Sequence, residues 1–356
     1  MNEHELAILR QFCLDAEPAS CTPYGCGHIN RTYLVATAGG RCYILQKINH
    51  HTFRDVAGLM ENIELVTEHL RRKSPDPRSV LTLIRTKDGK SYLEADDGYW
   101  RVFRFVEDSI CLQQPESDAD FYESAVGFGT FQQLLSDFPA EKLHETIPNF
   151  HNTPDRYRAF HETLTRDPMH RAAQVQPEIE FALARQAEMA ALQTALTAGE
   201  LPLRVTHNDT KLNNVLLDVK TRRALCVIDL DTVMPGSSLY DFGDSIRFGA
   251  ATAAEDEKDL SKMEMSLDRF RVFTRGYVRA CPGLTAKELE LLPMGAKTMT
   301  MECGVRFLTD YLDGDHYFAV HRDGQNLDRA RTQFKLVADM EKKWDEMRKI
   351  VEEESR

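Results

Sequence analysis

The sequence lacks several features that would each have indicated a class of protein. It has no apolar run long enough to cross a bilayer, and its first residues, MNEHE, lack the basic and apolar segments of a signal peptide. Its eight cysteines form no C-x-x-C pair, which argues against a zinc site or a redox dithiol. We therefore expect a cytoplasmic protein with reduced thiols and no contact with membranes.

Basic residues are also scarce relative to acidic ones. The chain has 44 Lys and Arg against 56 Asp and Glu, a formal net charge of −12. Nucleic-acid binding demands a basic face, so the charge argues against a nucleic-acid partner. An anionic nucleotide could still bind where a divalent cation and local basic side chains neutralise it.

The pattern along the 356 residues changes once, from strand-rich to helix-rich. The first part predicts a helix at 4–15, strands at 32–36 and 42–45, a helix at 55–73, and strands at 80–85 and 99–106. The rest predicts helices at 119–136, 177–198, 260–280, 285–313 and 326–353, with a strand-like island at 203–231. This order favours an α+β protein in two lobes, residues 1–107 and 108–356.

The most informative motif, H-x-D-x-x-x-x-N, spans His207 to Asn214 and precedes an apolar strand. Twenty residues after Asp209, a second apolar stretch, CVIDLD, places Asp229 at its end. This layout is typical of the catalytic loop and metal loop of protein-kinase-like folds. It predicts a bilobal kinase fold that uses ATP and Mg²⁺.

Phosphoryl transfer needs positioning and charge neutralisation, which suggests a role for each of these residues. Asp209 is placed to accept the hydrogen bond of the acceptor hydroxyl. Asn214 and Asp229 supply the oxygen ligands that Mg²⁺ prefers. Asp231 is either a second metal ligand or a solvated neighbour on the same strand face. Lys211 either contacts the γ-phosphate or forms an ion pair within the loop.

Several segments together resemble the N-acetylhexosamine 1-kinases, within the aminoglycoside phosphotransferase and choline kinase superfamily. The segments run over nearly the whole chain: GHINRTYLV (27–35), ILQKIN (44–49), LMENIELVTEHL (59–70), YWRVFRFVEDS (99–109), THNDTKLNNVLLD (206–218), CVIDLDTVMPGSSLYDFGDSIRFGA (226–250) and MECGVRFLTDYLDGDHYF (301–318). The resemblance implies conversion of N-acetylglucosamine or N-acetylgalactosamine, with ATP, to the sugar 1-phosphate. It also implies that Asp241, although it begins a D-F-G triplet, starts a helix and braces the catalytic loop. His207 is expected to orient that loop.

Candidate nucleotide-binding residues lie in the first lobe. Gly25 and Gly27 occupy a turn where backbone N–H groups could approach phosphate oxygens. Lys47 is the lysine of the following strand, although Gln46 could instead be the inward-facing residue. The acid expected to pair with the lysine is Glu61, with Glu64 as the alternative. The connector between the lobes, from Phe105 to Glu107, is expected to hydrogen-bond the adenine.

Candidate sugar-binding residues are Arg306 and Tyr317, with His28 and Asn30 reaching across from the first lobe. Arginine can donate several hydrogen bonds to hydroxyl or acetyl oxygens, and tyrosine can stack on a sugar face. Two alternatives stay open. One is a related kinase acting on an aminoglycoside or an amino-alcohol such as choline or homoserine, and the other is a non-catalytic, nucleotide-binding pseudokinase. A two-lobed kinase is also expected to close on its substrate.

Overall fold

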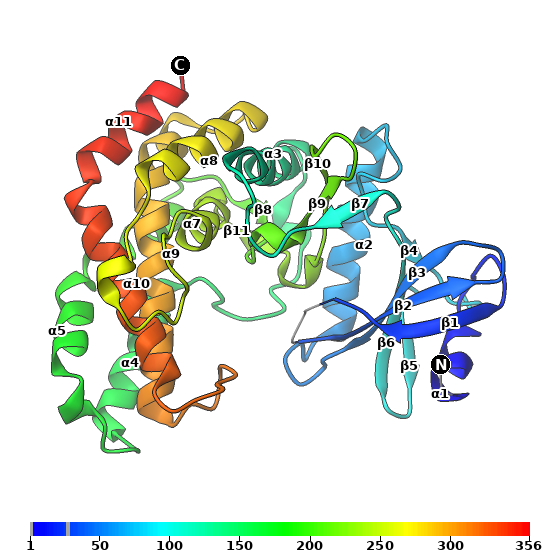
Figure 1. Ribbon diagram of the computed structural model, residues 1–356, viewed down its shortest axis with the longest axis horizontal. Coiled ribbons are helices and arrows are strands. Elements are labelled where there is room, and N and C mark those ends of the chain that lie inside the picture. Colours follow the sequence, from blue (N-terminus) through cyan, green and yellow to red (C-terminus); the bar gives the residue numbers. More distant parts are fainter. Residues whose placement is uncertain (1–2, 26–28) are drawn as a thin grey trace.

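The computed structural model describes residues 3–25 and 29–356. An antiparallel sheet forms the N-terminal region and a mostly helical assembly forms the rest, as Figure 1 shows. Helix α2 (Val56–Lys73) lies between the sheet and the helical region in this view. The mixed α+β arrangement expected from the sequence is therefore confirmed.

The N-terminal sheet has the order β1-β2-β3-β6-β4, and β5 also pairs with β6. Alternate residues of β3 face opposite sides. Tyr43 and Leu45 pack on the outer face with helix α1, whereas Ile44 and Ile48 face α2. The elements span α1 (Glu3–Leu9), β1 (Pro18–Pro23), β2 (Arg31–Thr37), β3 (Cys42–Ile48), β4 (Leu83–Ile84), β5 (Leu93–Ala95) and β6 (Gly98–Arg104).

The helical region is built around α9 (Ala286–Asp313), which packs against α7, α10 and α4. A capping box of Thr285 and Glu288 starts α9, and Gly314 ends it in the left-handed conformation. The other helices are α3 (Asp118–Leu134), α4 (Thr153–Arg166), α5 (Gln176–Arg185), α6 (Ala191–Thr197), α7 (Ser238–Gly249), α8 (Leu267–Ala280), α10 (Gln325–Lys342) and α11 (Trp344–Glu354).

Two small sheets lie where the two regions meet (Figure 1). One has the order β10-β9-β7 and the other pairs β11 with β8. Their strands are β7 (Ser109–Cys111), β8 (Arg204–Thr206), β9 (Val215–Asp218), β10 (Ala224–Val227) and β11 (Met234–Gly236). The loops between these strands carry the H-x-D-x-x-x-x-N motif and Asp229.

Several expected elements differ in detail. The patterns at 177–198 and 326–353 are each divided between two helices, and α4 and β1 were not expected. The strand expected through Asp231 ends at Val227, after which Asp229 turns left-handed with φ 59° and a 3₁₀ turn follows. Asp229 and Asp231 therefore do not share a strand face. No described helix combines the length and apolar character needed to cross a membrane.

Candidate active site

The loop from His207 to Asp209 is fixed by Asp241, in the first turn of α7. The carboxylate of Asp241 accepts hydrogen bonds from the backbone amides of His207 and Asn208, at 2.9 and 2.8 Å. Gln132 donates to the same carboxylate at 2.8 Å. The expected bracing role of Asp241 is confirmed by these contacts. Asn208 adopts a left-handed φ of 65°, which turns the chain sharply and is tolerated best by Gly, Asn and Asp.

The ring of His207 is completely buried and holds the end of β10. Its Nε2 lies 2.8 Å from the carbonyl oxygen of Ile228, one residue before Asp229. Phe128 and Phe131 pack edge-on against the ring, with centroids 5.5 and 6.0 Å away. His207 thus links the catalytic loop to the metal loop, in agreement with its expected orienting role.

Asp209, Lys211 and Asn214 come together on the loop. Lys211 Nζ lies 2.8 Å from Asp209 Oδ1. Asn214 Nδ2 donates to the backbone carbonyl of Asp209 at 2.7 Å and to its Oδ2 at 3.1 Å. Burial opposes the charged form of Lys211, but the Asp209 carboxylate outweighs it and raises the pKa of the lysine. The arrangement holds Asp209 between two donors, one of them cationic.

Asp229 lies beside Asn214 because their strands pair. Val227 of β10 is opposite Val215 of β9, and the amide of Ile228 donates to the carbonyl of Asn214 at 2.9 Å. The protein packed around Asp229, together with the charges of Asp231 and Asp209, raises the pKa of Asp229 to about 6. Such crowding of carboxylates favours the binding of a cation.

Asp231 is buried, which contradicts the expectation that it is a solvated neighbour. Its side chain is 4% exposed, and its Oδ1 lies 2.5 Å from Nη1 of Arg101, which is 1% exposed. Its Oδ2 accepts a 2.6 Å hydrogen bond from Asn30 Nδ2. Both carboxylate oxygens thus contact the N-terminal region, so Asp231 is not a solvated neighbour, and its role as a second metal ligand stays a prediction.

The structure does not bring Lys47 to the other site residues. Lys47 lies on the outer face of β3, where its Nζ is 2.5 Å from Asp97 and 5.4 Å from the Trp100 ring centroid. Glu61, its expected partner, contacts His144 at 2.7 Å instead, and Glu64 pairs with Arg85. Because residues alternate along a strand, Gln46 is the residue that faces inward.

The remaining nucleotide-binding candidates lie at the hairpin and the connector. Gly25 has φ +80°, a conformation that favours glycine, and an added Cβ would meet no atom within 4 Å. The amide of Phe105 donates to Cys42 within the sheet, whereas Glu107 follows the last pairing and is exposed. Gly27 and His28 lie outside the described residues.

Arg306 and Tyr317 do come together. Arg306 Nη2 donates to the Tyr317 hydroxyl at 3.3 Å, and its guanidinium lies 5.4–5.6 Å from the ring centroids of Phe150, Tyr317 and Phe318. Asp310 organises the loop that carries Tyr317, because it accepts hydrogen bonds from three successive amides, at residues 316–318. Asn30, the other described sugar candidate, is instead committed to Asp231 and to the amide of Asn49.

His151, which was not expected, connects this aromatic group to the catalytic loop. Its Nδ1 lies 2.8 Å from Glu302 of α9, one turn before Arg306, and its Nε2 lies 3.2 Å from the carbonyl of Asn208. Phe150 is the residue before it in the chain. We call the side chains of His151, Glu302, Arg306 and Tyr317 the acceptor side, because His151 links this group to the loop of Asp209. A lone histidine in the sequence gave no signal for this position.

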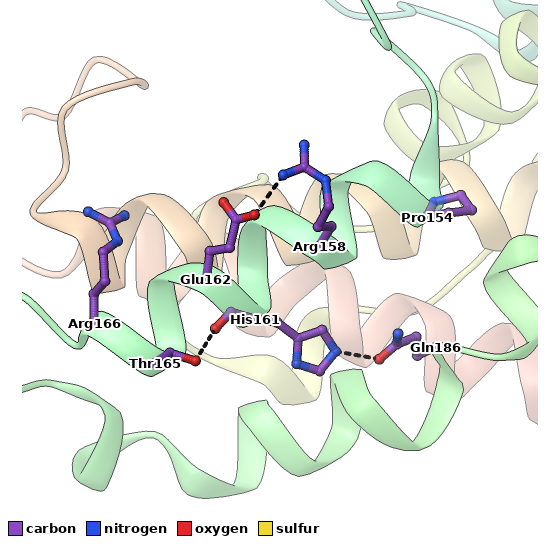
Figure 2. Close-up of a pocket in the computed structure, with 7 residues that line it drawn as sticks. All are labelled: Pro154, Arg158, His161, Glu162, Thr165, Arg166 and Gln186. Carbon is purple, nitrogen blue, oxygen red and sulfur yellow. Dashed lines mark hydrogen bonds and ion pairs between the residues drawn. The ribbon is translucent and has the colours of Figure 1, made fainter.

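An open depression of about 670 Å³ lies elsewhere, along α4 (Figure 2). Figure 2 shows that its side chains pair with one another, Arg158 with Glu162 at 2.6 Å and His161 with Gln186 at 2.8 Å. A smaller pocket of about 330 Å³ is lined by α2, α3 and β10. Neither contains a residue of the catalytic loop, so the predicted chemistry is not placed in them.

Comparison with known proteins gives a family and a fold. A family model described as the phosphotransferase enzyme family (APH) matches residues 20–264. A microcompartment-associated aminopropanol kinase is 15% identical with a TM-score of 0.60, covering 97% of this chain and 98% of that one. An aminoglycoside phosphotransferase from Alicyclobacillus acidocaldarius is 12% identical with a TM-score of 0.61, covering 98% and 96%. The amicoumacin kinase, solved with AMP-PNP and Ca²⁺, is 12% identical with a TM-score of 0.58, covering 96% and 94%. The expected protein-kinase-like fold is confirmed.

Proposed function

Since the chain belongs to the phosphotransferase enzyme family and is a small-molecule phosphotransferase, we propose that it phosphorylates the anomeric hydroxyl of N-acetylhexosamines. The substrates are N-acetylglucosamine or N-acetylgalactosamine with ATP, and the products are the sugar 1-phosphate and ADP. The proposal is carried by the acceptor side, which His151 connects to the catalytic loop and in which the carboxylates of Glu302 and Asp310 already have hydrogen-bond donors.

Asp209 is the proposed catalytic residue. Its carboxylate accepts the proton of the anomeric hydroxyl while the sugar oxygen bonds to the γ-phosphorus and the bond from that phosphorus to the β-phosphate oxygen breaks. Lys211, with Nζ 2.8 Å from Asp209 Oδ1, holds that carboxylate oxygen in place and adds positive charge where the γ-phosphate would lie. Asn214 fixes the other carboxylate oxygen, so Asp209 has little freedom to turn away.

ATP and Mg²⁺ are the proposed cosubstrate and cofactor. The donor set fits Mg²⁺, because Asp229 offers a carboxylate in a crowded anionic setting and Asn214 offers Oδ1 on the branch of the amide opposite its bound Nδ2. Bound Mg²⁺ would neutralise charge on the phosphates. The amicoumacin kinase, solved with a nucleotide analogue and a divalent cation, supports the same pairing in this family.

The charge of the acceptor side favours a neutral sugar over an ammonium. Glu302 is engaged by His151 at 2.8 Å and by Thr153 at 2.7 Å, and Asp310 is engaged by backbone amides. Arg156 lies close enough to Arg306 for their positive charges to interact. Its buried Nε has no hydrogen-bond partner among the described residues. Arginine side chains that can donate further hydrogen bonds suit a substrate with hydroxyl and acetyl oxygens as acceptors. An ammonium would instead be favoured by an unpaired carboxylate or a free aromatic cage, and here the rings of Phe150, Tyr317 and Phe318 already surround the Arg306 guanidinium.

The exposed ring of Tyr317 supports the same class of substrate. It is 67% exposed and stands beside Arg306, so a sugar could stack on the ring while the guanidinium donates to its oxygens. A second candidate is an amino-alcohol kinase, favoured by the fold likeness to an aminopropanol kinase. These two substrate classes differ in charge, which makes them easy to separate by experiment.

The test is ³¹P NMR of the protein with ATP and Mg²⁺ plus, in separate tubes, N-acetylglucosamine, N-acetylgalactosamine, choline or aminopropanol. We expect a sugar 1-phosphate signal with at least one N-acetylhexosamine. A phosphoryl ester with an amino-alcohol alone would replace the proposal by the second candidate. Unchanged ATP in every tube, from protein that still binds ATP, would contradict the proposal and leave a kinase for another acceptor, such as an aminoglycoside, or a pseudokinase.

Variants tie the reaction to the site. Arg306→Met and Tyr317→Ala should raise KM for the sugar while leaving the affinity for Mg·ATP unchanged. Arg158→Met, on the depression along α4, is the matched control and should alter neither constant. Equal sugar KM values in Arg306→Met and the wild type would remove the acceptor side from its assigned role.

A further inference from the structure

On the inward face of the N-terminal sheet, a buried positive charge lies on β6, whereas a lysine was expected on β3. In the kinase fold the phosphate-binding lysine belongs to β3. Here the inward position of β3 is the neutral Gln46, and Lys47 points to the outer face. Directly opposite Gln46, on β6, lies Arg101.

Arg101 is held by contacts to its Nε, to its Nη1 and to the face of its guanidinium. Its Nε donates to Gln46 Oε1 at 2.9 Å, and Gln46 in turn donates to Thr32 at 3.1 Å. Its guanidinium lies 5.1 Å from the ring centroid of Phe103. Its Nη1 lies 2.5 Å from Asp231 in the helical region. Arg101 is 1% exposed and has one carboxylate partner. The cost of removing both charges from water offsets much of their attraction, so the pair is better explained by a role in positioning than by stability.

The partner of Arg101 belongs to the turn that presents Asp229. Residues 230–232 form a single 3₁₀ turn directly after it. From the helical region, Thr232 donates to the carbonyl of His207 at 2.6 Å. From α2, Asn62 donates to the carbonyl of Val233 at 3.0 Å. Arg101 and Asn30 hold the middle of the same turn through Asp231.

We propose that Arg101 is a positioning residue of phosphoryl transfer, acting through Asp231. By holding the middle of the turn from the N-terminal sheet, it fixes Asp229 relative to the sheet that covers the nucleotide. Arg101 of β6 thereby supplies the inward-facing positive charge that β3 lacks, because the inward residue of β3 at this point is the neutral Gln46. The inference rests on the kinase activity of the family and not on the identity of the sugar.

The first test measures equilibrium binding, so it requires no acceptor. Arg101→Met should weaken the binding of Mg·ATP by about 10- to 100-fold, the usual effect of removing a group that orients a metal ligand. Binding of adenosine without Mg²⁺ should change by less than about twofold, because this ligand does not require Asp229. Arg104→Met, an exposed charge on the same strand, is the matched control. A loss of Mg·ATP affinity in Lys47→Met but not in Arg101→Met would overturn the proposal.

The second test asks whether Arg101 acts through Asp231. Arg101→Met/Asp231→Leu removes both buried charges, so the protein should fold even if the single variant does not. We expect the double variant to show the full loss of Mg·ATP affinity, and Asp231→Asn to show most of it. Wild-type affinity in the double variant would overturn the proposal. So would an undiminished effect of Arg101→Met in the Asp231→Asn background, because Arg101 would then contact the phosphates directly.

Discussion

The carboxylate of Asp209 owes its position to three neighbours that contact the loop. Asp241 holds the amides before it, and Lys211 and Asn214 hold its two oxygens. Asp209→Asn fills the same volume and keeps an acceptor for Lys211 or for Asn214, but not for both, because an amide has a single oxygen. Turnover should fall by about 10²- to 10⁴-fold, the usual contribution of a general base, with Mg·ATP affinity nearly unchanged. Single-turnover kinetics and a nucleotide titration measure the two quantities, and near-normal turnover would rule out the assigned role.

Single residues were predictable where function depends on spacing along the chain. Asp209 and Asn214 share one loop, so their separation could be read directly from the sequence. Arg101 could not be found this way, because its partner Asp231 lies 130 residues away in the chain. The inward position of Arg101 also depends on how β6 pairs with β3. The choice between Gln46 and Lys47 depended on which face of a strand turns inward, and an isolated strand with apolar residues on both faces leaves this undecided.

The start of α9 is tied to the strand that leads into the catalytic loop. Glu288 caps α9 and also accepts two hydrogen bonds from Arg204 of β8, one of them 2.6 Å long, with both side chains buried. Glu288→Ala should destabilise the protein by about 3–5 kcal/mol, because it leaves the Arg204 charge buried and unpaired. Denaturation with urea measures the change. Glu290→Ala, an exposed glutamate on the same helix, is the control and should cost less than about 0.5 kcal/mol.

The same element predicts a dependence on pH. Burial alone would raise the pKa of Glu288, but the hydrogen bonds from Arg204 and Ser238 outweigh it and lower the pKa below its ordinary value of 4.5. The stabilisation is therefore complete above pH 4.5 and is lost as the pH falls through the lower, folded-state value. The stability difference between wild type and Glu288→Gln should narrow on acidification in that range. A difference that stays constant down to pH 3 would contradict the assignment.

Helices were predicted best where their apolar periodicity is long and uninterrupted, as in α2 and α9. The missed helix α4 did carry a start signal, because Asn152 precedes Thr153 and Pro154, an N-cap residue followed by proline in the first turn. The division of 326–353 into α10 and α11 had no comparable signal. Lys343 sits between the two helices with φ −100°, and periodicity continues across it.

At the scale of the whole molecule, the two regions share one hydrophobic cluster. It combines Ile48, Met60 and Phe103 of the N-terminal region with Phe131 and Leu230 of the helical region. Helix α2 therefore buries its apolar side only when both regions are folded. The buried pair of Arg101 and Asp231 adds a polar connection across the same junction. The lobe boundary predicted near residue 107 separates the strands of the N-terminal sheet from those of the two small sheets. Residues on both sides of it nevertheless pack in one hydrophobic cluster.

The chain supplies two natural reporters of this coupling, because its two tryptophans lie far apart in the fold. Trp100 is 2% exposed in β6, and Trp344 begins α11, with Lys297 Nζ 5.6 Å from its ring centroid. We expect the single-tryptophan variants Trp344→Phe and Trp100→Phe to show one transition each in urea. Each midpoint should coincide with the midpoint of the same variant measured by circular dichroism, as a shared core requires. A Trp100 transition at lower urea than that of the helices would show that the N-terminal sheet unfolds independently, and that the shared cluster contributes little to its stability.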